Sequence, residues 1–285
     1  MNFFKILSLI ILLFCSSAKA DKALNIVTTS SPLAAIFHMI TTNDDKITYL
    51  VNHGCPHNYQ MQPSQIHLIK KANIIAYIDE EFDNFILKAS SNNEKSYVIK
   101  FSNLDLSLMK NPSGFTNWHV WMDTKNVRLM LFEIMDVVSK LRPQKKDTYL
   151  DNYNKSMHLL DLLDKKAATL SASTTLLLAD NLEYLFTKFK TPPSKILLGS
   201  KQATIEYVKN LRAQADSGKF YCAVISNHQS EDYYNNMLNN KLKIVTLNPE
   251  NWLINEKDSP ELIYFSNVQS MLNNLHNSCS GINLE

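Results

Sequence analysis

One short segment of the chain gathers three side chains that can bind a metal ion. His53, Cys55 and His57 lie within residues 53–57. Imidazole nitrogen and thiolate sulfur are both common zinc ligands. The same residues also have ordinary explanations, because Cys55 could be a buried spectator thiol and His53 a solvated loop histidine. The residue types therefore allow a metal site here without requiring one.

The sequence lacks the usual motifs of nucleotide-binding proteins and hydrolases. Its five glycines are not spaced as in G-x-G-x-x-G, G-x-x-x-x-G-K or G-x-S-x-G. H-E-x-x-H is also absent, and Glu183 is the one general base that we can name for an exported metallohydrolase with a zinc-bound water. We therefore expect no catalytic residue and no enzyme.

The first twenty residues have the features of a secretory signal peptide. Residues 1–5 carry one positive charge, residues 6–14 form an apolar run broken only by Ser8, and residues 18–20 read A-K-A, which matches an A-x-A cleavage site. The apolar run is too short to cross the roughly 30 Å of a bilayer core as a helix. Cys15 follows the bulky Phe14, which is a poor lipobox residue. We expect cleavage after Ala20 and export to the periplasm.

Composition and charge describe an ordinary globular protein. The chain has 285 residues, 45% of them hydrophobic and 20% charged, which suffices for one large domain or two modest ones. Removal of Lys5 and Lys19 with the signal peptide leaves 29 − 2 = 27 basic residues against 27 acidic ones. A neutral chain does not favour nucleic-acid binding, and no later apolar run approaches the length of a membrane span. We expect a soluble monomer that binds no nucleic acid.

Short apolar segments alternate with amphipathic helical patterns along the chain. Strands are expected at residues 25–30, 46–51, 73–78, 96–101, 174–179, 195–198, 220–226 and 243–247. Helices are expected at residues 33–40, 65–71, 182–189, 203–215, 231–238 and 260–276, and residues 102–116 are expected to form a loop. This alternation is typical of parallel sheets that are covered by helices.

Two long helical patterns lie in the middle of the chain. Asp123 can cap the first one, and Pro143 ends it. The second pattern predicts a helix of roughly 39 Å, which is long enough to span two lobes. The sequence therefore predicts an α/β protein of two lobes, each with a mostly parallel sheet flanked by helices. The predicted parts are a signal peptide (1–20), an N-terminal lobe (21–143), a connecting helix (144–170) and a C-terminal lobe (171–285).

Three cysteines remain after export, so one of them must be unpaired. Cys222 lies in the strand expected at 220–226, and Cys279 follows the last helical pattern. A Cys222–Cys279 disulfide would fasten the C-terminus to the second half of the chain in an oxidising compartment. It would leave Cys55 free.

Two histidine-containing segments resemble the signatures of a known family. Residues 54–59 (G-C-P-H-N-Y), 62–65 (Q-P-S-Q) and 71–77 (K-A-N-I-I-A-Y) resemble "G-x-x-x-H-x-Y … x-P-S-D … x-A-D-L-V-x-Y". Residues 117–124 (N-W-H-V-W-M-D-T) resemble "D-P-H-x-W-x-D/S-P". Both signatures belong to substrate-binding proteins of zinc and manganese ABC importers, known as metal-binding cluster A-I or bacterial solute-binding protein family 9. The resemblance covers residues 24–280 and is closest to the zinc-uptake type, whose C-terminal disulfide falls at the two cysteines named above.

The resemblance implies a metal ion held between the lobes by four ligands. Two of them transfer to His57 and His119, whose imidazoles suit zinc. The other two positions align with Ala179, which has no donor atom, and with Asn248, which is a weak, neutral ligand.

Several neighbouring residues could complete such a site. Asp180 follows Ala179 directly, although it could instead cap the next helix. Cys55 and His53 share the loop of His57. His228 follows a strand end, where it could face the cleft or lie in a surface loop.

The function implied by the resemblance is capture of a divalent metal ion by the substrate-binding component of an ABC transporter. Zinc is preferred and manganese is the second choice, because imidazole and thiolate are softer ligands than carboxylate. The partner is a membrane permease that receives the ion. The alternative is a divergent paralogue that has lost tight metal binding and carries another solute or acts as an adhesin-like surface protein.

Overall fold

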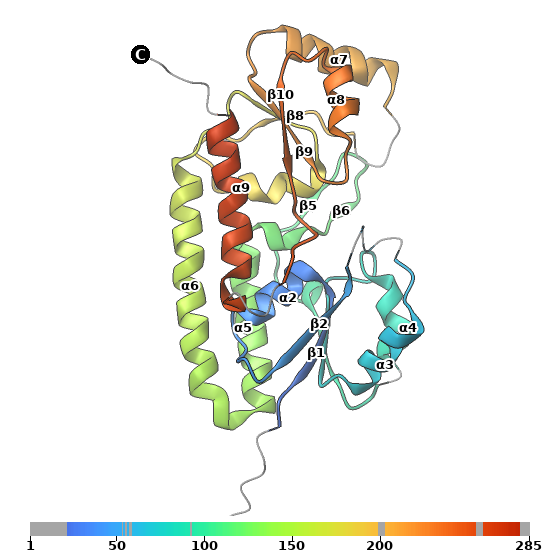
Figure 1. The fold of residues 1–285 in the computed structure, drawn as a ribbon, viewed down its shortest axis with the longest axis vertical. Coiled ribbons are helices and arrows are strands. Elements are labelled where there is room, and N and C mark those ends of the chain that lie inside the picture. Colours follow the sequence, from blue (N-terminus) through green and yellow to red (C-terminus); the bar gives the residue numbers. More distant parts are fainter. Residues whose placement is uncertain are drawn as a thin grey trace, which may run out of the picture.

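The computed structural model describes residues 22–52, 54, 56, 59–91, 93–198, 203–254 and 259–279. His53, Cys55 and His57 lie outside these ranges, so the predictions that rest on them have no structural counterpart here. Two four-stranded sheets lie one above the other, with two long helices running alongside (Figure 1). We call residues 22–143 the N-terminal lobe and residues 171–279 the C-terminal lobe.

The N-terminal lobe is built on an all-parallel sheet of order β2-β1-β3-β4. Its strands are β1 (Asn25–Ser30), β2 (Lys46–Val51), β3 (Ile74–Tyr77) and β4 (Tyr97–Lys100). Its helices are α2 (Ser31–His38), α3 (Pro63–Lys71), η2 (Asn84–Ile86), α4 (Leu87–Ser90), η3 (Phe101–Asn103), η4 (Val120–Met122) and α5 (Thr124–Leu141). Helices α3 and α4 cover one face of the sheet, and α2 and α5 lie over the other (Figure 1). Strand β3 is buried throughout because both faces are covered.

The C-terminal lobe repeats this plan with a parallel sheet of order β10-β9-β7-β8. Its strands are β7 (Thr175–Leu177), β8 (Ser194–Lys195), β9 (Cys222–Ser226) and β10 (Lys243–Leu247). Its helices are η6 (Asp180–Phe186), α7 (Ile205–Asp216), α8 (Glu231–Met237), η7 (Pro260–Leu262) and α9 (Ile263–Cys279). Helices α7 and α8 pack on one face, whereas α9 packs on the other.

The two lobes are connected by η5 (Pro143–Lys145) and the 24-residue helix α6 (Lys146–Thr169). At 1.5 Å per residue α6 is about 36 Å long, and it runs beside α5 and α9 (Figure 1). One hydrophobic core extends through both lobes, from Ile26 in β1 to Leu177 in β7 and Val245 in β10. The predicted α/β class with two parallel sheets is confirmed, and the shared core favours small relative movements of the lobes over a wide hinge motion.

Two segments differ in kind from their sequence-based expectation, and the strand expected at 195–198 is observed only as β8 at Ser194–Lys195. Residues 182–189 were expected to form an α-helix, but the structure has the 3-10 helix η6 with Asn181–Phe186 buried. The predicted loop 102–116 contains a short antiparallel hairpin, β5 (Met109–Lys110) and β6 (Thr116–Asn117). The Tyr184 hydroxyl accepts from Met109 N at 2.7 Å and donates to Asn117 O at 2.8 Å, so η6 and the hairpin hold each other. A local pattern does not reveal such a tertiary contact.

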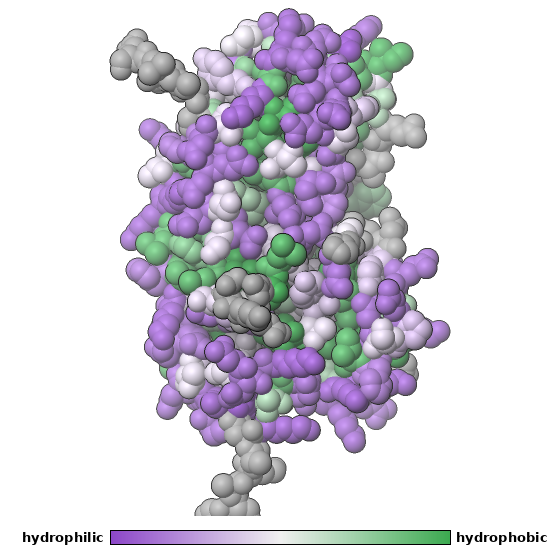
Figure 2. Space-filling model, in the orientation of Figure 1, coloured by the Kyte–Doolittle hydropathy of each residue, from purple (hydrophilic) through white to green (hydrophobic). Residues whose placement is uncertain are grey.

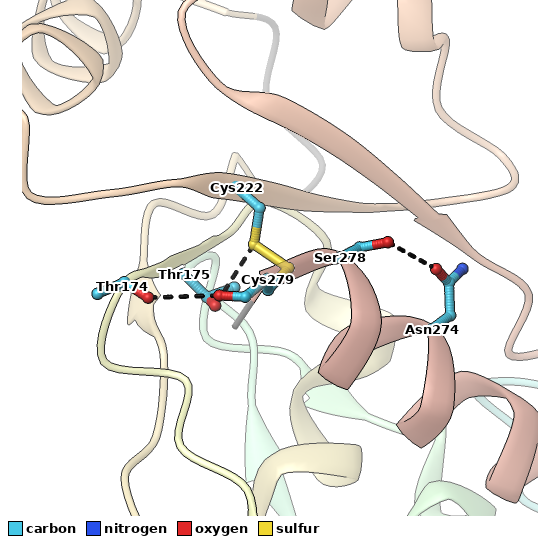
Figure 3. The surroundings of a disulfide bond; sticks show 6 residues. All are labelled: Thr174, Thr175, Cys222, Asn274, Ser278 and Cys279. Carbon is cyan, nitrogen blue, oxygen red and sulfur yellow. Dashed lines mark hydrogen bonds between the residues drawn. A yellow bond between two sulfur atoms is a disulfide. The ribbon is translucent and has the colours of Figure 1, made fainter. Parts of the chain in front are cut away.

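The Cys222–Cys279 disulfide is present, as predicted. It joins β9 to the last residue of α9 with a Cα–Cα distance of 5.4 Å (Figure 3). Both residues are buried, and the bond closes a segment with a sequence separation of 57. The disulfide therefore anchors the C-terminal helix to the centre of the second sheet.

Removing this disulfide should destabilise the protein strongly. The Cys222→Ala/Cys279→Ala variant is expected to lose about 4 kcal/mol of unfolding free energy, because an unfolded chain without the bond gains loop entropy. Urea unfolding of parent and variant under non-reducing conditions measures this difference. Equal midpoints would show that the bond adds no stability.

Asp83 is a fully buried carboxyl group directly before η2. Its Oδ2 accepts from Ile78 N, and its Oδ1 has no hydrogen-bond partner among the described residues. Burial raises the pKa of Asp83 to about 7, against the opposing effect of the Ile78 hydrogen bond. The carboxyl group is therefore much easier to ionise in the unfolded chain than in the folded one.

This difference predicts a pH-dependent stability. The folded-state pKa of Asp83 lies above its unfolded value, so protonation of Asp83 favours the folded state. This stabilisation is fully present below about pH 4 and is lost as the pH rises to about 7. Asp83→Asn stays neutral and keeps an acceptor for Ile78 N. Between pH 4.5 and pH 8 the parent should lose about 3 kcal/mol relative to Asp83→Asn, as measured by urea unfolding. Parallel stability curves for the two proteins would contradict this expectation.

The face in Figure 2 is mainly hydrophilic, with hydrophobic side chains in smaller patches. Among the helices that the structure describes, none combines the length and the apolar character that a bilayer span requires.

Candidate functional site

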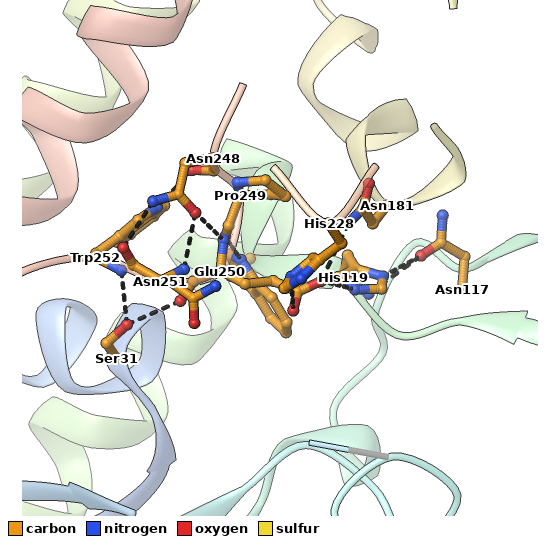
Figure 4. Close-up of polar contacts among 11 residues, drawn as sticks. Ser31, Asn117, His119, Asn181, His228, Asn248, Pro249, Glu250, Asn251 and Trp252 are labelled. Atoms are coloured by element: carbon orange, nitrogen blue, oxygen red, sulfur yellow. Dashed lines mark hydrogen bonds and ion pairs between the residues drawn. The ribbon is translucent and has the colours of Figure 1, made fainter. Parts of the chain in front are cut away.

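Three side chains from different parts of the chain meet between the lobes. His119 of the N-terminal lobe places Nε2 2.7 Å from Glu250 Oε1, and His228 of the C-terminal lobe places Nε2 2.9 Å from Glu250 Oε2 (Figure 4). His228 and Glu250 follow β9 and β10 respectively. The carboxyl ends of parallel strands are where α/β sheets present their ligand-binding residues. We call His119, His228 and Glu250 the interlobe cluster.

His119 is held in one orientation by its neighbours. It lies directly before η4, with its ring edge-on to the rings of Phe82 and Trp121 at centroid distances of 5.5 and 5.2 Å. Its Nδ1 donates to Asn117 Oδ1 at 2.9 Å, because the amide nitrogen of Asn117 is engaged with the carbonyl of Asp180. The second ring nitrogen, Nε2, therefore faces the C-terminal lobe. It either donates a proton to Glu250 or offers its lone pair to a cation.

Glu250 lies on a loop that is fastened to the N-terminal lobe. Its carbonyl accepts from Ser31 Oγ at 2.8 Å, and the carbonyl of Pro249 accepts from Trp121 Nε1 at 2.9 Å. Glu250 is only 6% exposed. Burial by itself would raise its pKa, but the hydrogen bonds and charges of His119 and His228 lower the pKa of Glu250 well below its ordinary value. The cluster therefore holds a buried negative charge between two imidazoles.

His228 is the more accessible imidazole of the cluster. It lies one residue beyond Asn227, at the end of β9, and its side chain is 30% exposed. The hydrogen bond to Glu250 raises the pKa of His228, while partial burial acts in the opposite direction. His228 therefore combines both alternatives left open by the sequence: it lies in an exposed turn after β9, and its Nε2 contacts Glu250 between the lobes.

Asn181 completes the polar surroundings of Glu250. Its Nδ2 donates to Glu250 Oε1 at 3.1 Å. Its Oδ1 is buried and has no hydrogen-bond partner within the described part of the chain. An unpaired buried oxygen is costly, and it is commonly satisfied by a water molecule or an ion.

The remaining predicted ligands lie in different settings. Asn248 Oδ1 accepts from the backbone N–H groups of Glu250 and Asn251, and its Nδ2 donates to Asn251 O at 2.7 Å, so its amide is used within the loop. Asp180 begins η6, with its carbonyl bound to Asn117 Nδ2. Ala179 is buried beside it.

Glu183, the general base weighed for a hydrolase, is paired elsewhere. Its Oε1 accepts from Lys195 Nζ at 2.8 Å, and its Oε2 lies 3.4 Å from Asn117 Nδ2. Glu183 is thus engaged by Lys195 and Asn117, and neither imidazole of the interlobe cluster is among its hydrogen-bond or ion-pair partners in the described residues.

Sequence reasoning missed Glu250. Two signals pointed to it: it follows a predicted strand, and it lies two residues after Asn248, where the family signature places an acidic residue. The loop places the neighbouring carboxylate, rather than the Asn248 side chain, against the histidines. An alignment by position alone does not detect this shift.

The interlobe cluster has the donor types that divalent transition metals prefer. Two imidazole nitrogens and one carboxylate form a His2Glu set of the kind that binds zinc. Among the described residues, no group of three His, Cys, Asp or Glu side chains has a geometry that could hold a metal ion as it stands. In the interlobe cluster the Glu250 oxygens instead contact the two imidazoles directly. A cation would enter by taking the place of these hydrogen bonds.

Comparison with known proteins places the chain in a family. A family model described as the periplasmic component A of the zinc-uptake complex (ZnuA) matches residues 26–278. The "uncharacterized protein RP014" of Rickettsia prowazekii is 31% identical over 261 residues, which is 90% of this chain and 85% of that protein. The "metal ABC transporter substrate-binding lipoprotein SloC" of Streptococcus mutans is 28% identical over 173 residues, 56% of each chain.

A solved structure supports the same assignment at the level of the fold. The "periplasmic zinc binding protein TroA" of Treponema pallidum superimposes with a TM-score of 0.74 at 16% identity, covering 90% of this chain and 99% of that one. At this identity the likeness concerns the fold alone. The family model, by contrast, matches nearly the whole described chain, and so the chain belongs to the family of the periplasmic component A of zinc-uptake complexes.

Proposed function

We propose that this protein is the substrate-binding component of an ABC importer that captures one divalent metal ion between its two lobes, with zinc preferred over manganese. The observation that carries the proposal is the meeting of His119 from one lobe with Glu250 and His228 from the other. His57, placed by the family signature but outside the described residues, is proposed as a further ligand. Asp180, Asn248, Cys55 and His53 are the additional candidates from the sequence.

The relatives support this assignment by what their names state. SloC is named as a metal ABC transporter substrate-binding lipoprotein, and TroA as a periplasmic zinc-binding protein. The family itself is one of solute-binding transport proteins. We infer that this chain likewise works with a membrane permease, acts as a monomer, binds no nucleic acid and catalyses no reaction.

The fold suggests how the ion would be held and released. The loop 248–252 belongs to the C-terminal lobe but is bonded to the N-terminal lobe through Ser31 and Trp121. The Tyr264 hydroxyl of α9 also donates to Trp121 O at 2.8 Å. These bonds and the shared core restrict closure to small movements, so transfer to a docked permease would depend on a slight separation of His119 from Glu250 and His228.

Calorimetric titration of the metal-stripped, exported protein with zinc and with manganese tests this proposal. We expect saturable binding of one zinc ion per chain and weaker binding of manganese. Absence of saturable binding of either ion would contradict the proposal and favour the divergent-paralogue alternative.

Export itself gives a separate prediction. Cleavage after Ala20 should remove residues 1–20 and leave Asp21 as the N-terminus. Intact mass spectrometry of the periplasmic protein measures this directly. A mass that retains these residues, or that includes lipid on Cys15, would contradict the prediction.

A further inference from the structure

We infer that the C-terminal half of the cation site has moved: Glu250 and His228 supply its ligands, in place of the two positions occupied by Ala179 and Asn248. The inference rests on the proposed function and specifies which residues of this chain carry it. It assigns Asn248 and Asn181 to positioning roles.

The two family positions cannot contribute strong ligands in this fold. Ala179 ends in a methyl group and is 3% exposed. The polar atoms of the Asn248 side chain are both used in the turn that it forms, with Nδ2 on the carbonyl of Asn251 and Oδ1 on the N–H groups of Glu250 and Asn251 (Figure 4). The same bonds fix the direction in which the loop presents Glu250. Asn248 is therefore a positioning residue.

Glu250 restores the negative charge that the site lacks at position 248. Its backbone is held by Ser31 and, through Pro249, by Trp121, so the carboxylate can move only by rotation of its own side chain. That side chain is directed at His119 and His228, as Figure 4 shows. The carboxylate of Glu250 is buried and contacts both imidazoles, so a cation that replaced the protons of these hydrogen bonds would meet two nitrogen donors and one anionic oxygen donor.

His228 supplies the second new donor from a different strand. The lost position 179 follows β7, whereas His228 follows the adjacent strand β9 at the same edge of the sheet. Its Nε2 and that of His119 point at opposite oxygens of one carboxylate, 2.9 and 2.7 Å away. A cation entering between them would displace the Nε2 protons of the two hydrogen bonds into solvent and form bonds to nitrogen and oxygen at about 2.0–2.2 Å.

Asn181 provides an independent indication that something further binds here. Its Nδ2 already donates to Glu250 Oε1, which fixes the orientation of the amide. Its Oδ1 is left buried without a partner in the described residues. Reversing the amide would bring two oxygens together, so the unpaired atom is a property of the site. A metal-bound water would satisfy it.

Zinc titration of the metal-stripped, exported protein tests the inference. Glu250→Gln and His228→Asn should each weaken zinc binding by at least about tenfold, and the pair together should weaken it further. The matched controls are Glu231→Gln and His158→Asn, which change an exposed glutamate of α8 and an exposed histidine of α6. Both controls should bind zinc as the parent does. Asp180→Asn tests the competing candidate that the sequence offers.

The outcomes separate this inference from the proposed function. If the parent binds one zinc ion while Glu250→Gln and His228→Asn keep the affinity of the parent, the inference is wrong and metal capture stands. If the parent binds neither zinc nor manganese, the inference and the proposed function are both wrong. A loss confined to Asp180→Asn would move the C-terminal ligand to η6. His228 is partly exposed, so its variant remains informative even if the buried Glu250→Gln protein folds poorly.

A second readout distinguishes ligands from supporting residues. Zinc-edge X-ray absorption of the loaded protein counts coordinating imidazoles. His228→Asn should lower that count by one, whereas Asn181→Ala should leave the count unchanged. An unchanged count in His228→Asn would show that His228 does not touch the ion.

Discussion

Replacing His119 by alanine should weaken zinc binding by about 100-fold or more, since losing even an outer-shell partner of a metal ligand commonly costs 10–100-fold. His119 is the one described imidazole that the N-terminal lobe contributes to the interlobe cluster. Asn117 fixes its ring and directs Nε2 toward Glu250, so the variant loses a nitrogen ligand that is already positioned. Competition with a chelator of known zinc affinity measures the change.

The control for this prediction is His158→Ala. It removes the same chemical group from an exposed position on α6, far in sequence from the cluster. The control should bind zinc with the affinity of the parent. If His119→Ala and His158→Ala both bind zinc like the parent, zinc binds at a site that does not include His119.

The second large effect is on stability, and it concerns the buried polar network where the first sheet meets the connecting helix α6. Asp45 accepts from Arg142 at 2.6 Å and from the Tyr149 hydroxyl at 3.2 Å, as well as from the backbone N–H groups of Leu24 and Thr42. The side chain of Asp45 is fully buried, and that of Arg142 is 2% exposed. This buried network ties the start of α6 to the edge of β2.

Asp45→Asn should therefore lower the unfolding free energy by about 3–5 kcal/mol, because it leaves the Arg142 charge buried without its main counter-charge. Urea unfolding provides the measurement. The double variant Asp45→Asn/Arg142→Met should be more stable than Asp45→Asn alone, since it removes the unpaired charge.

An exposed ion pair serves as the comparison. Lys140 and Asp136 form an i,i+4 pair on the surface of α5. Asp136→Asn should change stability by less than about 0.5 kcal/mol. If Asp45→Asn costs no more than this exposed control, the network does not hold the connecting helix.

Much of the fold could be predicted because its elements are encoded locally. Strands 25–30, 46–51 and 243–247 have the predicted limits, since β-branched runs bounded by polar or helix-starting residues define them. The predicted cap of α5 is confirmed, as Asp123 accepts from Lys125 N. Hairpin β5–β6 and helix η6 could not be predicted in the same way. Their form depends on Tyr184, which joins them across 75 residues.

The site was only partly predictable for a related reason. His119 was placed by a signature that spans adjacent residues and is visible in the sequence. Glu250 depends on a turn formed by Asn248 and on bonds to Ser31 and Trp121, residues that are far apart in the chain. The ligand position therefore results from loop geometry, which spacing alone does not specify.

The most direct test of the central claim is an anomalous difference map at the zinc absorption edge, from crystals of the zinc-loaded protein. We expect one strong peak between the lobes, about 2.0–2.1 Å from His119 Nε2 and within bonding distance of a side chain of the C-terminal lobe. The absence of a peak there, or peaks only at exposed histidines such as His67 and His158, would contradict the claim.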